Sequence, residues 1–369
     1  MTPANTTSQA GSERSQATDI GRVFLDLPRM FSRVTLCVVP AIFAMYVPMC
    51  APKMMPTAPP WGAQMDQFWE QPVNLAERDL FYGPWGPERA PDPQATYTFV
   101  KKKQQGTNPG VTVRDPQGRE WSVKQPPHND QGAEGPVEVV LSRVLSAAGY
   151  HQPPVYFLPS FTITDLSGTH QEAGGRFRLR DTSLTNRGPW SWQQNPFVGT
   201  KPYQGLLVIL MMFDSSDLKN ANNTLYEVTR SDDEVKRWYV VRDLGTALGE
   251  TGRLKPKRGD PDIFERHAFI TGVSEGFVEF SYHGWHQELV RHRITPQEVH
   301  WASDLLAGLS DRQWADAFRA GGYESAVAAR FIRALLARIA QGERVGLKSP
   351  RPSLVGAVSS PLMVGARPW

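Results

Sequence analysis

The segment DLKNAN at residues 217–222 and the segment VRDLG at residues 241–245 are the most informative parts of this sequence. Asp217 is followed five residues later by Asn222, and Asp243 comes at the end of an apolar strand pattern. Phosphoryl transfer uses these residue types, because one Asp accepts a hydroxyl proton while an Asn and a second Asp hold Mg²⁺ beside the phosphates. The spacing therefore predicts Asp217 as a catalytic base and Asn222 and Asp243 as metal ligands.

The alternative for both segments is an ordinary surface turn, since Asp and Asn favour turns. By chance, the full Asp-Leu-Lys-x-x-Asn string occurs in roughly one in a hundred chains of this length. Its context favours the functional interpretation, because the apolar segment 205–213 predicts a buried helix before it and residues 225–241 predict a hairpin after it. The Asp-Leu-Gly string alone is a weak signal and gains weight from its place after Asn222.

Two upstream residues complete the pattern. Lys124 ends a predicted strand, and Glu138 lies in a predicted helix over residues 136–145. A lysine in this place can hold the α- and β-phosphates of ATP, and a helical glutamate can pair with it. Glu134 is a competing partner, which we place before the helix. We prefer Glu138 because a residue inside a packed helix is held in place, although a lone lysine at a strand end is more often solvated.

Lys219 is a further candidate, as a point charge that contacts the transferred phosphate. The turn between residues 101 and 110 is the candidate phosphate-covering loop, where Gly106 and Gly110 would let backbone N–H groups reach the ligand. This turn has no Gly-x-Gly-x-x-Gly pattern. The histidines match no zinc-binding pattern, and we interpret them as surface or core residues.

The composition limits the classes of protein and partner. The chain has 369 residues, 40% of them hydrophobic, which is enough for two lobes with a sizeable core. Its formal net charge of +3 gives no electrostatic footprint for nucleic acid. The two cysteines, Cys37 and Cys50, both lie in the N-terminal apolar segment, so the rest of the chain has no disulfide framework and no cysteine-based zinc site.

The N-terminal region predicts export or membrane attachment. Residues 1–29 are polar and are expected to be disordered, or to precede the true start at Met30. Residues 30–50 contain the uncharged run 34–50, which follows Arg29 and Arg33, and this arrangement is typical of a signal peptide or a membrane anchor. Cys50 is a candidate lipid-modified cysteine of a lipoprotein, with a free cysteine as the alternative. We expect a periplasmic or envelope-attached protein, and a cytoplasmic one if residues 30–50 are not a signal.

The pattern of elements predicts an α+β fold in two lobes. A Pro-rich linker over residues 51–78 leads into a small β-rich lobe over 79–165, a mainly helical lobe follows over 166–345, and residues 346–369 are expected to be a disordered tail. The elements expected in the first lobe are strands at 96–100, 111–115, 120–124, 155–158 and 161–164 and the helix at 136–145. Those expected in the second lobe are the helix at 205–213, the hairpin, helices that start with capping boxes at 295 and 310, and a helix over 324–339.

These residues resemble the atypical branch of the protein-kinase-like superfamily, which includes persistence-toxin kinases, phosphoinositide kinases and secreted casein-type kinases. The resemblance extends over roughly residues 96–345 by the order of its motifs. It implies a two-lobed protein-kinase-like fold, ATP and Mg²⁺ as cofactors, and a protein, lipid or sugar hydroxyl as the acceptor. The chain is also similar to a poorly characterised group of bacterial exported proteins that carry the Asp-Leu-Lys-x-x-Asn and Asp-Leu-Gly strings.

The chain departs from ordinary protein kinases at several positions. FDSS at residues 213–216 replaces the usual His-Arg before the catalytic Asp, Leu244 replaces the usual Phe, and no Ala-Pro-Glu string follows. These departures leave peptide recognition and activation-loop control open. The alternative is a catalytically inactive pseudokinase, or an envelope-attached binding lipoprotein, that kept the fold without the chemistry.

Overall fold

The computed structural model describes residues 64–103, 108–126, 133–229, 235–253 and 257–348. The predictions for residues 1–29, for the signal peptide or anchor at 30–50, and for Cys50 and Gly106 lie outside these residues. The described residues belong to one unit of mixed α and β structure. No helix among them is both long enough and apolar enough to span a membrane.

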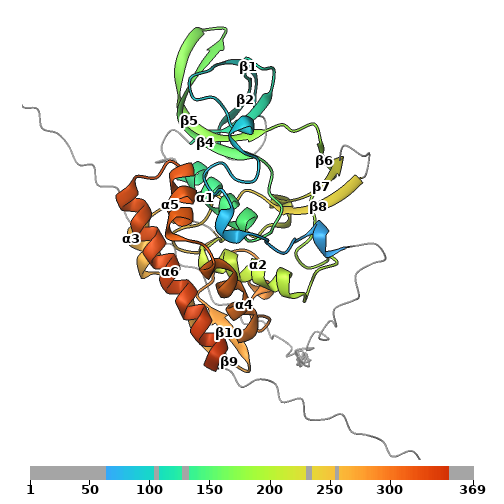
Figure 1. Cartoon of the computed structure of the whole chain (residues 1–369), viewed down its shortest axis with the longest axis vertical. Coiled ribbons are helices and arrows are strands. Elements are labelled where there is room, and N and C mark those ends of the chain that lie inside the picture. Colours follow the sequence, from blue (N-terminus) through green and yellow to red (C-terminus); the bar gives the residue numbers. More distant parts are fainter. Residues whose placement is uncertain (1–63, 104–107, 127–132, 230–234, 254–256, 349–369) are drawn as a thin grey trace, which may run out of the picture. The chain divides into compact units, whose positions relative to one another are not determined.

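Five strands form a closed barrel in the order β1-β2-β3-β5-β4 (Figure 1). These strands are β1 (Thr96–Lys102), β2 (Gly110–Arg114), β3 (Glu120–Lys124), β4 (Val155–Asp165) and β5 (Gly168–Leu179). Neighbouring strands are antiparallel except β1 and β4, which pair in parallel and close the barrel. The predicted β1–β2–β3 meander is confirmed. By contrast, β4 is one strand where two were expected, and β5 was not predicted.

Alternation along the strands decides which side chains fill the barrel. On β3, Trp121 and Val123 point into the interior and are at most 1% exposed. Phe177 on β5 lies edge-on to Trp121, with 6.1 Å between the ring centroids. The alternate residues of both strands therefore share the outer face, and Lys124 is paired there with Arg176 across the ladder.

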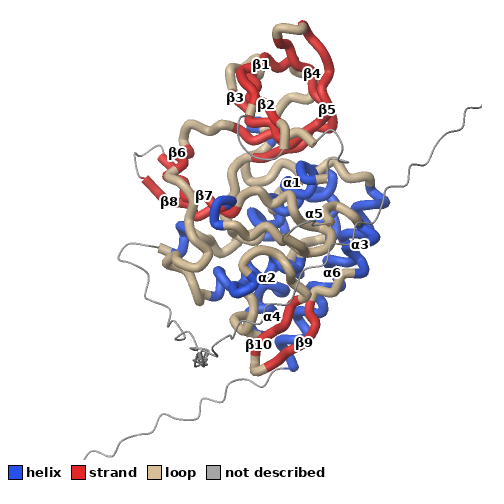
Figure 2. Tube along the Cα trace, turned by 180° about the vertical axis from the view of Figure 1, so that it is seen from behind, coloured by secondary structure: helices blue, strands red, loops and turns tan. Residues whose placement is uncertain are grey.

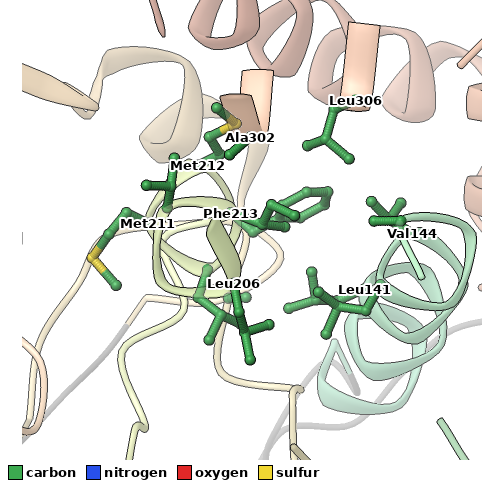
Figure 3. Packing of buried hydrophobic residues seen from close by; sticks show 14 of the residues in the cluster. Leu141, Val144, Leu206, Met211, Met212, Phe213, Ala302 and Leu306 are labelled. Carbon is green, nitrogen blue, oxygen red and sulfur yellow. The ribbon is translucent and has the colours of Figure 1, made fainter. Parts of the chain in front are cut away.

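The helices lie together at one end of the barrel, as both views show (Figure 1, Figure 2). They are α1 (Glu134–Ala147), α2 (Lys201–Met212), α3 (Pro261–Arg266), α4 (Pro296–Ala307), α5 (Asp311–Ala320) and α6 (Ser325–Lys348). Helix α2 is buried all round, as its uninterrupted apolar pattern predicts. Figure 3 shows how Leu141 and Val144 of α1 face Leu206 and Phe213 of the α2 segment, with Leu306 of α4 beside them.

Two small sheets and five single turns of 3-10 helix complete the described structure. The sheets contain β6 (Leu184–Asn186), β7 (Asn223–Thr229) and β8 (Val235–Val241), and β9 (Ile270–Ser274) and β10 (Phe277–Phe280). The 3-10 turns are at Met65–Gln67, Leu75–Glu77, Pro87–Arg89, Asn220–Asn222 and Gln287–Leu289. The pairing of β7 with β8 confirms the hairpin that was predicted after Asn222.

Both predicted capping boxes are present. Thr295 accepts a hydrogen bond from the Glu298 backbone at the start of α4, and Ser310 accepts one from Gln313 at the start of α5. The Glu298 and Gln313 side chains bond back to the cap residues, so each box satisfies two N-terminal backbone donors. Local side-chain chemistry therefore fixes where these two helices begin.

Several boundaries differ from the expected ones. Part of the expected linker packs in the core, because the Phe68 ring stacks on Phe197 at 4.9 Å between centroids and is buried. The barrel continues through β5 to Leu179, beyond residue 165, since β5 is needed to bridge β3 and β4. Helix α6 continues to Lys348. The two-lobed arrangement itself remains a prediction.

We predict opposite effects for two helical Gly→Ala changes. Alanine is the better helix former by about 1 kcal/mol, but a Cβ at Gly205 would lie 2.1 Å from a ring carbon of Trp301. Gly205→Ala should therefore lower the free energy of unfolding by about 1–3 kcal/mol. A Cβ at Gly135 would lie 3.4 Å from its nearest neighbour. Gly135→Ala should therefore leave the free energy of unfolding unchanged or raise it. Urea unfolding measures both, and a loss of equal size at both positions would contradict the packing argument.

Candidate active site

Lys124 at the end of β3 lies among three carboxylates. Its Nζ atom is 3.0 Å from Glu134 Oε2, 3.9 Å from Glu138 Oε2 and 3.8 Å from Asp243 Oδ1. These carboxylates come from the first and second turns of α1 and from the loop after β8. The structure thus brings together Lys124, Glu138 and Asp243, three of the residues that the sequence singled out.

Glu134 is the nearer of the two α1 carboxylates to Lys124. The helix begins at Glu134 rather than at residue 136, so Glu134 is a first-turn residue, where a negative charge is favoured by the helix dipole. Glu134 also accepts bonds from Asn108 and Arg258. The preference for Glu138 assumed that a packed helix holds Glu138 but not Glu134. This assumption is wrong, because Glu134 is also part of the helix and is held by the contacts with Asn108 and Arg258.

Glu138 has partners that the sequence did not reveal. Its Oε1 atom lies 3.1 Å from Arg176 Nε and 2.9 Å from Arg178 Nη2, both on the outer face of β5. Burial opposes ionisation of this carboxyl, but the charges of Arg176, Lys124 and Arg178 outweigh it and hold the Glu138 pKa well below its usual range. Glu138 is therefore an ionised carboxylate that joins α1 to two strands of the barrel.

Asp243 occupies a constrained turn. Its φ of 53° is in the left-handed region, which costs a non-glycine residue roughly 1–2 kcal/mol. Gly245 lets this turn approach α1, because a Cβ there would lie 2.6 Å from the Glu134 carbonyl oxygen. The Asp243 side chain remains 37% exposed, with Oδ1 3.9 Å from Arg178 Nη2. The turn thus presents an accessible carboxylate to the Lys124 side of the site.

Backbone contacts hold the Asp217 loop against the Asp243 turn. The Asn222 amide donates to the Asp217 carbonyl at 2.8 Å, and the Arg242 N–H donates to the Asn222 carbonyl at 3.2 Å. One residue before Asp217, Ser216 N–H donates to the Thr246 carbonyl at 3.1 Å. These bonds make the loop and the turn neighbours, although they lie far apart in the sequence.

Lys219 lies against the predicted base. Its Nζ atom is 2.8 Å from Asp217 Oδ1 and 4.9 Å from the centre of the Trp285 ring. The Trp285 backbone N–H donates to the Ser216 carbonyl at 2.9 Å, and the Tyr282 hydroxyl lies 3.3 Å from the same oxygen while it donates to the Trp285 carbonyl at 2.7 Å. The loop after β10 therefore fixes the backbone before Asp217. Burial, followed by the Asp217 charge, raises the pKa of Tyr282 far above its usual value, so its hydroxyl stays protonated.

The donor atoms present fit a magnesium ion. Mg²⁺ takes oxygen ligands and is commonly held by one or two carboxylates together with substrate phosphates. The Asn222 amide nitrogen is used in the bond to Asp217, so its carbonyl oxygen is the atom left for a metal, and Asp243 supplies an accessible carboxylate. The described residues contain no cluster of three or more His, Cys, Asp or Glu side chains that would hold a metal by themselves.

Of the two glycines in the predicted phosphate-covering turn, the structure describes only Gly110. Gly106 lies outside the described residues. Gly110 begins β2, where a Cβ would lie 2.4 Å from the Val123 carbonyl oxygen. Strand packing already requires a glycine at Gly110, so this residue type is no evidence for a phosphate contact, and the phosphate-covering role stays a prediction.

A cleft of 1150 Å³ opens beside this cluster. It lies between β3, β5 and the segment from β6 to β8, and five arginines line it. The arginines are Arg114, Arg119, Arg178, Arg180 and Arg242. Arg176, Arg178 and Arg242 were not predicted as site residues, although the alternation RFRLR at residues 176–180 indicates a strand with one strongly basic face.

No protein-family model and no curated protein matches the chain. Among solved structures, it is similar to the Helicobacter pylori proinflammatory kinase CtkA, with a TM-score of 0.36 and 10% identity, over 69% of this chain and 99% of that chain. It is also similar to the Rio2 kinase of Chaetomium thermophilum in its ADP/Mg²⁺–phosphoaspartate complex, with a TM-score of 0.30 and 12% identity, over 67% and 72% of the two chains. At these TM-scores, function has to be inferred from the geometry of this chain.

We predict that Glu138→Gln destabilises the protein more than Glu134→Gln. The first change leaves Arg176 and Arg178 facing a neutral amide in a buried place, which should lower the free energy of unfolding by about 3 kcal/mol or more. Glu134 is less buried than Glu138, and it contacts Lys124, Asn108 and Arg258. Glu134→Gln should therefore lower the free energy of unfolding by clearly less than Glu138→Gln does. Denaturant unfolding of the two variants checks this, and equal losses would show that Glu138 has no special role.

Glu138 should also make the free energy of unfolding depend more steeply on pH in the acid range. Its pKa in the folded protein is depressed, so its contribution is fully present above the unfolded pKa of about 4.3 and is lost as the pH falls toward the folded value. Below pH 4.3, the wild type should lose up to about 1.4 kcal/mol per pH unit more than Glu138→Gln. Unfolding free energies measured from pH 5 to pH 3 test this, and parallel curves would contradict it.

Proposed function

We propose that this protein is an ATP- and Mg²⁺-dependent phosphotransferase of the kinase-like type, with a hydroxyl group as acceptor. One observation carries the proposal: Lys124, the α1 carboxylates and Asp243 meet within 4 Å, and the Asp217–Asn222 loop is hydrogen-bonded to the Asp243 turn. A lysine on a strand, a helical glutamate, an Asp-x-x-x-x-Asn loop and a second Asp are the recurring parts of phosphoryl transfer in protein kinases.

Each residue has a role that follows from its place. Lys124, held by Glu134 and Glu138, binds and orients the phosphates of ATP. Asn222 and Asp243 would hold Mg²⁺, which when bound neutralises charge on the phosphates. Asp217 accepts the proton of the acceptor hydroxyl as its oxygen attacks the γ-phosphorus and ADP leaves. Lys219, 2.8 Å from Asp217, supplies a positive charge beside the transferred group.

The proposal also includes the class of acceptor and the cellular location of the protein. A protein, lipid or sugar hydroxyl satisfies the chemistry at Asp217 equally, since only the oxygen and its proton take part. Attachment to the cell envelope through residues 30–50 is proposed from their apolar sequence. A nucleotide-binding protein without transfer activity is the competing outcome of the experiment below.

We expect Asp217→Asn to reduce label transfer from ATP by about 10²–10⁴-fold, because an amide cannot accept the hydroxyl proton. Asp243→Asn should reduce it by a comparable factor. Asp304→Asn, an exposed residue on α4 away from the cluster, is the matched control and should keep wild-type activity. The measurement uses the full chain with labelled ATP and Mg²⁺, both for self-labelling and with mixed protein, lipid and sugar acceptors.

Equal label in wild type and Asp217→Asn would remove the catalytic proposal. A thermal-shift scan with ATP and Mg²⁺ then separates the remaining possibilities, since a ligand that binds only the folded state raises the melting temperature. A shift without transfer indicates an inactive nucleotide-binding protein. No shift with any nucleotide indicates a protein with another role at the envelope.

A further inference from the structure

The cleft beside Lys124 is strongly cationic. Its lining contains five arginines but only two carboxylates, Glu120 and Asp181. Both of these acids are already paired: Glu120 with Arg114 and Arg180, and Asp181 with Arg89. Arg119 is paired with Asp115 and Arg178 with Glu138, so among the described residues Arg242 is the arginine of the lining that has no carboxylate within 4.0 Å.

Arg242 is a guanidinium without a carboxylate partner. Its Nη1 atom donates to the Thr224 hydroxyl at 3.0 Å and to the Tyr226 hydroxyl at 3.2 Å, which are both neutral groups. Its Nε atom is buried and has no hydrogen-bond partner. Within the part of the chain that the structure describes, no carboxylate oxygen lies within 4.0 Å of the nitrogens of this partly buried residue, whereas charges removed from water are normally paired.

Arg178 reaches the same place from the barrel. Its Nη2 atom binds Glu138 at 2.9 Å and lies 3.9 Å from Asp243, and its Nε atom is buried without a partner. Arg178 and Arg242 line the same cleft, and the charge of Arg178, followed by burial, lowers the pKa of Arg242. Two like charges in one cleft repel each other, and an anion bound there relieves this repulsion.

The local charge balance favours an anion. Lys124, Arg176 and Arg178 stand among Glu134, Glu138 and Asp243, so these six charges cancel before Arg242 is added. Arg242 then brings a positive charge, while Asp243 is the carboxylate assigned to the metal. Guanidinium groups bind phosphate through two parallel N–H bonds, and such charge-assisted bonds are the strong ones.

We propose that Arg178 and Arg242 form a phosphate-binding pair that holds the polyphosphate chain of the nucleotide in this cleft. Arg178 lies 3.9 Å from Asp243 and Arg242 directly precedes it in the chain, so the pair complements Lys124 and makes binding depend on the number of phosphates. This inference rests on the proposed function for the identity of the ligand as a nucleotide. The transfer reaction itself does not enter it.

The test measures dissociation constants of the full chain by titration calorimetry. The ligands are adenosine, AMP, ADP, ATP and inorganic triphosphate, each with and without Mg²⁺. Arg242→Gln is the principal variant because it breaks no ion pair, and Arg178→Gln is the second. Arg180→Gln is the matched control, because Arg180 is on the same strand and lines the same cleft but is 48% exposed at its rim.

Arg242→Gln should weaken ATP and inorganic triphosphate binding about 10-fold or more, which corresponds to losing one charge-assisted bond. It should leave adenosine binding unchanged, and Arg180→Gln should leave all ligands unchanged. Without ligand, the melting temperature of Arg242→Gln should equal or exceed that of wild type, because a repulsion has been removed. Equal loss for adenosine and ATP, unchanged ATP binding, or a destabilised ligand-free variant would each overturn the proposal.

Transfer activity separates this inference from the proposed function. If ATP binds through the pair but no label is transferred by wild type, the phosphate pair stands and the phosphotransferase does not. If label transfer occurs and Arg242→Gln keeps the wild-type KM for ATP, the phosphotransferase stands and the pair does not.

Discussion

The Glu138 carboxylate and its cations form the interaction on which the rest of the structure depends. The carboxylate is buried on α1, and its partners come from two barrel strands: Lys124 on β3, and Arg176 and Arg178 on β5. An ionised carboxylate is expensive to remove from water unless opposite charges stand close to it. Helix α1 can therefore pack on the barrel only with this set of charges assembled, which fixes the helix, both strands and the outer face of the barrel at once.

The same charges that hold the fold also suit the polyphosphate ligand that we propose. Lys124, Arg176 and Arg178 are balanced by Glu134, Glu138 and Asp243, and Arg242 adds a positive charge that is bonded only to the neutral hydroxyls of Thr224 and Tyr226. In the free protein this excess persists as repulsion between guanidinium groups that are held in place by packing and hydrogen bonds. A polyphosphate would meet donors that are already positioned, so little of its binding energy would be spent on ordering side chains. Stability and affinity are thus linked through one set of residues.

Local signals in the sequence were enough for much of the fold. The capping boxes at Thr295 and Ser310, the all-apolar helix α2 and the hairpin after Asn222 each depend on residues near one another in the chain, and all are confirmed. The barrel closure was not predictable in this way, because β1 pairs in parallel with β4, far along the chain. β5 was missed although it forms a hairpin with β4 and its RFRLR alternation at residues 176–180 is a local signal, and the arginines that contact Glu138 were missed with it.

The residues of the candidate site also differ in whether a local sequence pattern revealed them. Lys124, Glu138 and Asp243 were found because each stands in a recognisable local pattern, and the structure brings their side chains within 4 Å. Glu134 was set aside on a helix boundary that was wrong by two residues. The cost of the left-handed backbone at Asp243 is offset because Gly245 lets the turn lie against the Glu134 carbonyl, while Leu244 is buried beside it. A displacement of α1 would therefore break the Glu138 cluster and release the Asp243 turn together, so Lys124 and Asp243, the residues proposed to bind phosphate and metal, are coupled through the first turns of one helix.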